Sequence, residues 1–219
     1  MTKVKKTYSE KIIKVIDELP YFRISDLVSL HNDREYLKRF LFRQKKRGKI
    51  ASLKRGVYVS TEYLRRIKNS SGVVDAYYEL VANTIYQPSY LSCEYVLQKY
   101  GIMSEAVIAI TSVSTKKTNK FTNELSTFRY YSIKEYLFTG FVIKQKGDFT
   151  IAEASVAKAL FDFLYFRKTF LNSLGEIKEL RLNLENLKKK DFQELKKYIK
   201  LEKSKKMQKV YNHLVKLYE

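Results

Sequence analysis

One stretch of sequence decides the predicted fold: Asn32-Asp-Arg-Glu-Tyr-Leu-Lys-Arg-Phe-Leu-Phe-Arg-Gln-Lys-Lys-Arg-Gly-Lys-Ile-Ala-Ser-Leu-Lys-Arg-Gly-Val-Tyr-Val-Ser60. Asn32 or Asp33 is a typical N-cap, and it predicts a helix from Arg34 to Arg47. Gly48 follows at the position where helices commonly end in a left-handed residue. Two short β-type runs then flank Lys54-Arg55-Gly56, which indicates a hairpin.

The residues before this stretch add three more elements. Glu10–Leu19 predicts a helix that Pro20 ends, Ile24 is short and extended, and Ser25 is a typical N-cap for a helix at Asp26–Leu30. Helix, short strand, helix, helix and hairpin, in that order, form a winged helix-turn-helix. We therefore predict such a DNA-binding domain in residues 1–68.

The helix predicted at Arg34–Arg47 separates its side chains by chemistry. With successive residues about 100° apart, one side holds Leu37, Phe40, Leu41 and Gln44, and the opposite side holds Arg39, Arg43 and Lys46 beside Glu35 and Phe42. A recognition helix needs an apolar side toward its own domain and cations toward the major groove. The candidate DNA-binding residues are Arg34, Lys38, Arg39, Arg43 and Lys46 on this helix and Lys54 and Arg55 at the hairpin tip. The alternative is an ordinary solvated basic face.

Charge points to the same kind of partner. The 219 residues contain 43 Lys and Arg against 23 Asp and Glu, a net charge of +20. Residues 1–70 hold 19 of these cations and 7 of the acids, so the positive charge is densest at the N-terminal end. A strongly basic chain favours a polyanion such as nucleic acid. A lysine-rich composition that reflects only the codon usage of the host is the alternative for the excess elsewhere.

Other classes of protein are disfavoured by composition. No apolar run approaches the length of a membrane span. Cys93 is the single cysteine, which excludes a disulfide framework and a cysteine-based zinc site. We therefore expect a cytoplasmic protein with neither a structural metal nor a membrane anchor.

The remainder, residues 73–219, has mixed patterns. Helices are predicted at Val73–Thr84, Ser89–Tyr100 and Ala154–Arg167, and strands at Val107–Val113, Thr127–Ser132 and Phe141–Lys144, with Thr61–Ser71 as a connector. Two amphipathic stretches follow near the C-terminus, one with Phe192, Leu195 and Ile199 and one with Met207, Val210, Leu214 and Leu217. The predicted fold class is α+β: a winged helix-turn-helix followed by a larger mixed α/β domain that ends in helices.

Little in the sequence indicates catalysis. His31 and His213 are far apart in the chain and suggest no catalytic pair, and neither nucleotide-binding glycine motif occurs. Cys93 lies in an apolar context, where a buried small hydrophobe is the commoner role. We expect no enzyme activity and no cofactor.

Five segments in a fixed order carry a resemblance to a known family. They are Pro88–Ile102, Ile110–Lys116, Phe128–Ile133, Leu137–Gly140 and Ala157–Tyr165, preceded by Tyr36–Phe40, Gly48–Ile50 and Leu53–Tyr58 and followed by Glu179–Asn183. Together they closely resemble the AbiEi family, the antitoxins of type IV abortive-infection systems. One departure is Ser155-Val-Ala-Lys-Ala-Leu160, where many members carry Pro and Glu before the lysine. That glutamate therefore cannot be carried over to this chain as a functional residue.

The resemblance implies two tasks. The N-terminal domain would repress its own operon by binding double-stranded DNA at inverted repeats. The C-terminal domain would counter a nucleotidyltransferase-like toxin without a stable complex and would add basic surface to DNA binding. The residues expected on that C-terminal basic surface are Lys116, Lys117, Lys120, Arg129 and Lys158.

Three alternatives stay open at this point. The C-terminal lysines could serve only solubility. The chain could be a plain winged-helix operon regulator whose C-terminal domain binds an effector. It could also be a DNA-processing enzyme with a nuclease-like part at residues 73–219.

Overall fold

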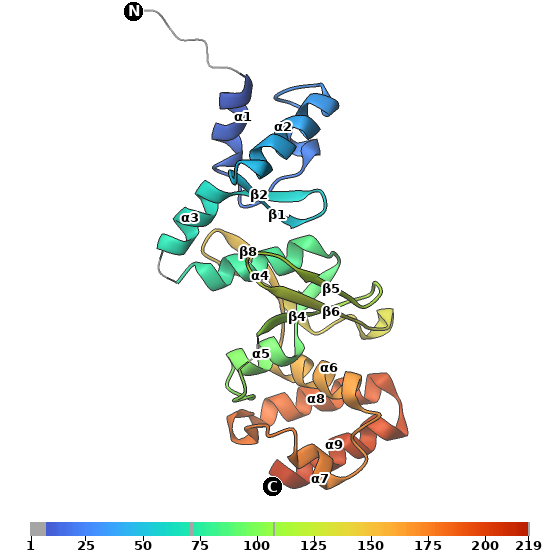
Figure 1. Ribbon diagram of the computed structural model, residues 1–219. Coiled ribbons are helices and arrows are strands. Elements are labelled where there is room, and N and C mark those ends of the chain that lie inside the picture. The colour runs from blue at the N-terminus through green and yellow to red at the C-terminus, as the bar shows by residue number, and fades with distance from the viewer. Residues whose placement is uncertain (1–7, 71, 107, 219) are drawn as a thin grey trace, which may run out of the picture. The chain divides into compact units, whose positions relative to one another are not determined.

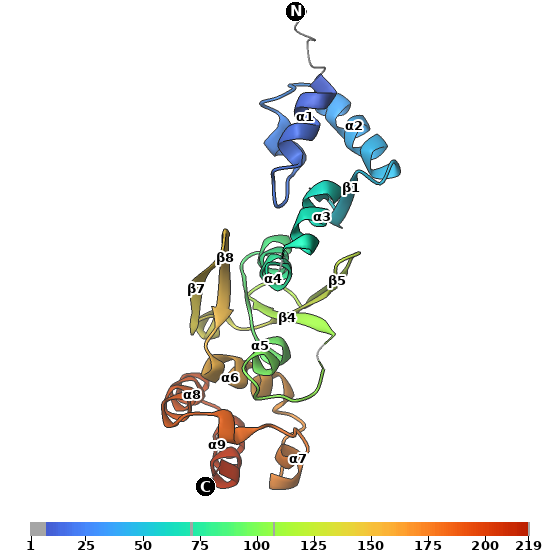
Figure 2. The same ribbon diagram turned by 90° about the vertical axis from the view of Figure 1, so that its left-hand side faces the viewer.

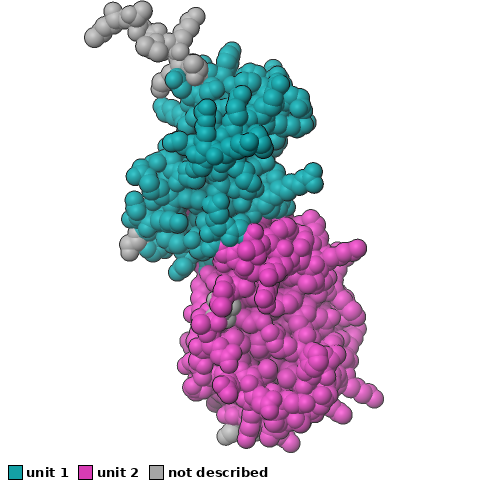
Figure 3. Space-filling model, in the orientation of Figure 1, with its two compact units in different colours: residues 1–81, 123–125 teal, residues 82–122, 126–219 magenta. Residues whose placement is uncertain are grey.

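The computed structural model describes residues 8–70, 72–106 and 108–218, and the chain is a mixed α+β protein. It divides into two compact units (Figure 3): unit 1 comprises residues 1–81 and 123–125, and unit 2 comprises residues 82–122 and 126–219. The domains drawn from the sequence, 1–68 and 73–219, stay a prediction. None of the helices in the described residues has the length and apolar character that crossing a bilayer requires.

Unit 1 is built from helices around one hairpin (Figure 1). Its elements are α1 (Tyr8–Ile16), the 3₁₀ helix η1 (Ile24–Leu27), α2 (Arg34–Lys46), β1 (Ile50–Lys54), β2 (Val57–Ser60), α3 (Thr61–Asn69) and the first part of α4 (Val74–Ile85). β1 and β2 are antiparallel, and Phe22 extends the hairpin by exchanging two backbone hydrogen bonds with Tyr58, at 2.8 and 2.9 Å. One core joins α1, η1, α2 and the start of β1: Ile12, Ile16, Phe22, Leu27, Leu37, Phe40, Leu41 and Ile50.

The predicted stretch at residues 32–60 is confirmed. The Asp33 carboxylate accepts hydrogen bonds from the backbone N–H groups of Glu35 and Tyr36, at 2.9 and 3.0 Å, and so caps α2. Gly48 follows with φ of +66°, a conformation that costs glycine little. Gly56, with φ of +81°, turns the hairpin.

Three predictions for unit 1 are wrong. Ile24, expected to be short and extended, is the first residue of η1, and the residue that pairs with the hairpin is Phe22. The helix expected at Asp26–Leu30 is the single 3₁₀ turn η1, because the Asp26 carboxylate accepts from the backbone N–H of Arg23 and the helical turn begins earlier. The connector expected at Thr61–Ser71 is helix α3, whose N-cap is Ser60. Ser71 itself lies outside the described residues.

Unit 2 is a six-stranded mixed sheet with helices, which Figure 2 shows from a second side. Its elements after the end of α4 are β3 (Ser89–Leu91), α5 (Cys93–Lys99), β4 (Ala109–Ser114), β5 (Asn119–Thr122), β6 (Thr127–Ser132), η2 (Glu135–Leu137), β7 (Phe141–Lys146), β8 (Phe149–Ala154), α6 (Val156–Arg167), α7 (Leu174–Lys178), η3 (Leu184–Asn186), α8 (Lys189–Glu202) and α9 (Lys205–Tyr218).

The strand order of this sheet is β5-β6-β4-β3-β8-β7. β4 and β6 are parallel, and β3 meets β8 in parallel at Leu91 and Glu153, whereas the other neighbours are antiparallel. α5 and α6 lie between the sheet and α7–α9 (Figures 1 and 2). The predicted C-terminal amphipathic stretches are confirmed as α8 and α9, which bury the expected apolar side chains except Leu217.

One prediction for unit 2 is wrong. The helix expected over Ser89–Tyr100 begins only at Cys93, because the preceding residues pair with β4 as strand β3. Cys93 has φ of +56°, a left-handed conformation that is uncommon outside glycine. β8 was not predicted at all. The strand expected at Val107–Val113 is β4, and Val107 lies outside the described residues.

Candidate nucleic-acid interface

The packed side of α2 is the predicted one. Leu37, Phe40, Leu41 and Gln44 are all buried against unit 1, and Gln44 is 6 % exposed. Because the helical period fixes the opposite side once one side is packed, Arg39 and Lys46 face away from the core and are exposed. This helix therefore presents cations to solvent along a rigid, capped element.

An exposed aromatic ring lies among these cations. Phe42 is 61 % exposed, and the Lys46 ammonium lies 5.0 Å from the centre of its ring. On the neighbouring turn, Lys38 forms an exposed ion pair with Glu35 at 2.6 Å. When a helix enters the major groove, lysine can hydrogen-bond base edges and phenylalanine can contact thymine methyl groups.

A groove of about 510 Å³ runs between α2 and the hairpin, and its cations are Lys38, Lys45 and Arg55. Tyr58 of β2 and Leu41 of α2 also line this groove. Lys45 was missed in the sequence, although it lies seven residues after Lys38 and so falls on the same flank of the helix.

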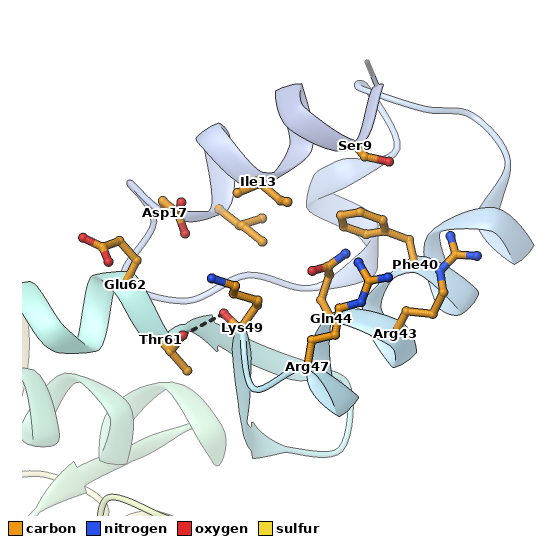
Figure 4. A pocket seen from close by; sticks show the side chains of 11 residues that line it. Ser9, Ile13, Asp17, Phe40, Arg43, Gln44, Arg47, Lys49, Thr61 and Glu62 are labelled. Atoms are coloured by element: carbon orange, nitrogen blue, oxygen red, sulfur yellow. Dashed lines mark hydrogen bonds between the residues drawn. The ribbon is translucent and has the colours of Figure 1, made fainter. Parts of the chain in front are cut away.

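The structure separates the predicted set into groups. Arg39 and Lys46 point outward, and Lys38 and Arg55 share the groove beside the hairpin. Arg43 lines a different groove, between α1, α2 and the start of α3 (Figure 4). The two remaining members are Arg34, which is exposed at the start of α2, and Lys54, which ends β1 and is partly buried.

Four of the five cations expected on the C-terminal basic surface are exposed. Lys116 and Lys117 follow β4, and Lys120 of β5 lies directly opposite Arg129 of β6 in the antiparallel register. Like charges at opposed positions destabilise a strand pair. The pairing of Lys120 with Arg129 therefore lowers the stability of the sheet locally, and it exposes two cations side by side.

The fifth, Lys158, is not on the surface. Its side chain is fully buried, and its ammonium lies 2.6 Å from Asp162 Oδ1 and donates to the Leu137 carbonyl at 2.9 Å. Asp162 Oδ2 accepts hydrogen bonds from the Tyr90 hydroxyl at 3.0 Å and the Ser92 hydroxyl at 2.7 Å. Burial raises the pKa of Asp162 even though these partners act in the opposite direction. The prediction is wrong because α6 buries this cation together with its own counter-ion, four residues on.

Sequence reasoning also missed a cluster at the other edge of the sheet. The fully buried Glu153 of β8 accepts from Lys99 at 2.5 Å, Lys144 at 2.6 Å, Lys146 at 2.9 Å and the Tyr100 hydroxyl at 2.8 Å. Burial alone would raise the pKa of Glu153, but the hydrogen bonds from the three lysines and Tyr100 bring it well below its usual range. The alternation of Lys144 and Lys146 along β7 was the only visible signal.

Two further findings concern metals and relatives. Among residues 8–70, 72–106 and 108–218, no three His, Cys, Asp or Glu side chains come together as metal ligands would. The sequence matches no model of a known protein family and no curated protein. The resemblance to the AbiEi family therefore stays a prediction.

Proposed function

We propose that this protein is the DNA-binding autorepressor and antitoxin of a type IV toxin–antitoxin operon. In this proposal, unit 1 carries a winged helix-turn-helix in residues 1–68, α2 is its recognition helix and the β1–β2 hairpin is its wing. The partner is double-stranded DNA at an inverted repeat, and the toxin is a nucleotidyltransferase-like protein that need not form a stable complex.

One observation carries the DNA-binding half: α2 is packed on one side and cationic on the other, with a basic groove between it and the hairpin. An α-helix fits the major groove of B-DNA, where arginine can donate two hydrogen bonds to guanine. Lys38, Lys45 and Arg55 would then lie where phosphates flank the groove. The antitoxin half rests on the sequence resemblance, and the paired cations Lys120 and Arg129 support a polyanion-facing or partner-facing surface there.

Removing cations from unit 1 is expected to change DNA binding in two different ways. Arg39→Ala together with Arg43→Ala should cost about 1–3 kcal/mol for each side chain that reads a base and should relax sequence preference there. Lys38→Gln, Lys45→Gln and Arg55→Gln together should weaken binding to all DNA sequences alike. The slope of log affinity against log salt concentration should become less steep by about 0.9 per lost phosphate contact. Salt-titrated binding to the duplex upstream of the gene measures both effects.

A matched control removes three exposed charges from α8: Lys196→Gln, Lys197→Gln and Lys200→Gln. This control should leave the salt slope within error of wild type. Wild-type affinity in the double arginine variant, or an equal loss in the α8 control, would contradict the assignment of α2 as the recognition helix.

The antitoxin half is tested by growth. The full chain should restore growth to cells that express the neighbouring nucleotidyltransferase-like gene from an independent promoter. Lys116→Glu, Lys117→Glu and Lys120→Glu together should reduce this rescue, because they reverse three exposed charges on the proposed surface. The unit 1 triple glutamine variant should rescue as wild type does. Repression without any rescue would instead identify a plain operon regulator.

A further inference from the structure

Unit 1 has a second groove, lined in part by the residues next to the open end of the hairpin, Lys49 before β1 and Thr61 after β2 (Figure 4). It lies between α1, the C-terminal half of α2 and the start of α3, and its volume is about 740 Å³. Sites for small molecules are typically concavities of roughly 300–1,000 Å³ with an apolar lining and a few convergent polar groups. The size of this groove therefore suits a small molecule.

Three cations line this groove: Arg43 of α2, Arg47 at the C-cap of α2, and Lys49 just beyond Gly48. In the part of the chain that the structure describes, no carboxylate lies within 4 Å of any of these three side-chain charges. Figure 4 shows the side chains of Arg47 and Lys49 directed into the groove. An anion bound to either side chain would gain charge-assisted hydrogen bonds, the stronger kind.

The acidic groups of the opposite wall leave this positive charge in excess. Asp17 and Glu62 are the two carboxylates that line the groove. Glu62 is already engaged with Arg65 at 2.7 Å, which lowers the pKa of Glu62 most, and Lys49 contributes only through longer-range attraction. Three cations against two carboxylates, one of them paired elsewhere, favour an anionic ligand.

The floor of the groove is apolar. Ile16 and Phe40 are each 1 % exposed, and Ile13 is half-buried beside them. The amide of Gln44 points from the buried side of α2 toward the same space (Figure 4). The half-buried Ile13 offers an apolar contact beside these cations, and one amide can donate or accept, which suits a small organic body that carries an anionic group.

We propose that this groove binds a small organic anion, with its apolar body against Ile13 and its carboxylate or phosphate on Arg47 and Lys49. We further propose that the bound anion weakens DNA binding. This second part rests on the proposed function: Arg43 lies on the helix that would face DNA and Arg47 caps its C-terminal end, and a negative charge beside them repels phosphates. Coupling of this kind is reciprocal, so DNA must weaken anion binding by the same factor.

The probe is 2-naphthoate, and 2-naphthylmethanol serves as its neutral counterpart. The full chain, labelled at isoleucine methyl groups, is titrated and followed by NMR. Naphthoate should bind at least about tenfold more tightly than the alcohol, since about 1.4 kcal/mol, a small part of one charge-assisted pair, already corresponds to tenfold. The Ile13 and Ile16 methyl signals should move first, because these side chains line the groove.

Two variants with equal charge locate the site. Arg47→Gln with Lys49→Gln should abolish the preference for the anion. Lys45→Gln with Lys46→Gln removes two charges from the last turn of α2, outside this groove. This variant should retain the preference for the anion. Equal binding of acid and alcohol, or equal loss in both variants, would overturn the anion site.

The regulatory part is measured with the duplex upstream of the gene. Saturating naphthoate should weaken DNA binding at least about fivefold, the lower end of common allosteric couplings, and the Arg47→Gln, Lys49→Gln variant should show no such response. Anion binding with unchanged DNA affinity would overturn the coupling. Anion binding by a chain that binds no duplex would overturn the proposed function and leave the anion site supported.

Discussion

Replacing Lys158 by methionine is expected to lower the free energy of unfolding by about 3–5 kcal/mol, the usual cost of removing one partner from a buried ion pair. Asp162 would remain in the core with both oxygens cut off from solvent and without the ammonium that lies 2.6 Å away. The Leu137 carbonyl would lose its donor as well. Denaturant unfolding followed by circular dichroism measures the loss.

The control for this change is Lys200→Met, the same substitution at an exposed position of α8, which should stay within about 0.5 kcal/mol of wild type. The double variant Lys158→Met, Asp162→Leu should recover part of the loss, because it removes both buried charges together. Recovery should be incomplete, since the hydroxyls of Tyr90 and Ser92 then lack their acceptor. A single variant as stable as wild type would show that α6 does not depend on this pair.

Replacing Glu153 by glutamine is expected to cost about 3 kcal/mol, at the lower end for a buried ion pair because its three lysines are 23–33 % exposed. One neutral amide would then face Lys99, Lys144 and Lys146, which repel one another. Glu185→Gln, an exposed change of the same kind, should have little effect. Equal stability of the two variants would contradict the role of Glu153 as the common counter-ion.

The stability of the protein at acidic pH should also depend on Glu153. The pKa of Glu153 lies well below its ordinary value of 4.5 in the folded chain, so below about pH 4.5 the unfolded state binds more protons at this group. The stabilisation is complete above that pH and is lost as the pH falls toward the lowered pKa. The free energy of unfolding, measured from pH 7 to pH 3, should therefore fall more steeply with decreasing pH for wild type than for Glu153→Gln.

Local signals in the sequence predicted α2 and the hairpin well. Asp33, Gly48 and Gly56 act within a few residues of their own position, so capping and turn chemistry can be read directly from the chain. The burial of Leu37 and Gln44 followed from periodicity alone. The class of the fold was predictable for the same reason, since most of its elements carry such local patterns.

Long-range partners were not predictable. Lys158 is neutralised by Asp162 on its own helix, but the groups that make the burial tolerable, Tyr90 and Ser92, lie about 70 residues earlier in the chain. Glu153 likewise gathers Lys99 from α5 and Lys144 from β7. The expected helix at Ser89–Tyr100 failed because pairing with β4 overrides local propensity, and no local signal reports a sheet partner.

The short strand β3 has a consequence for how unit 2 tolerates sequence change. Three residues, Ser89–Leu91, form the seam between β5-β6-β4 on one side and β8-β7 on the other, and β3 meets β8 at Leu91 and Glu153. Side chains reinforce the seam where the backbone ladder is brief: Tyr90 and Ser92 reach Asp162, and Glu153 reaches α5. A substitution at any one of these polar side chains therefore leaves its partners across the seam unsatisfied, so they must change together.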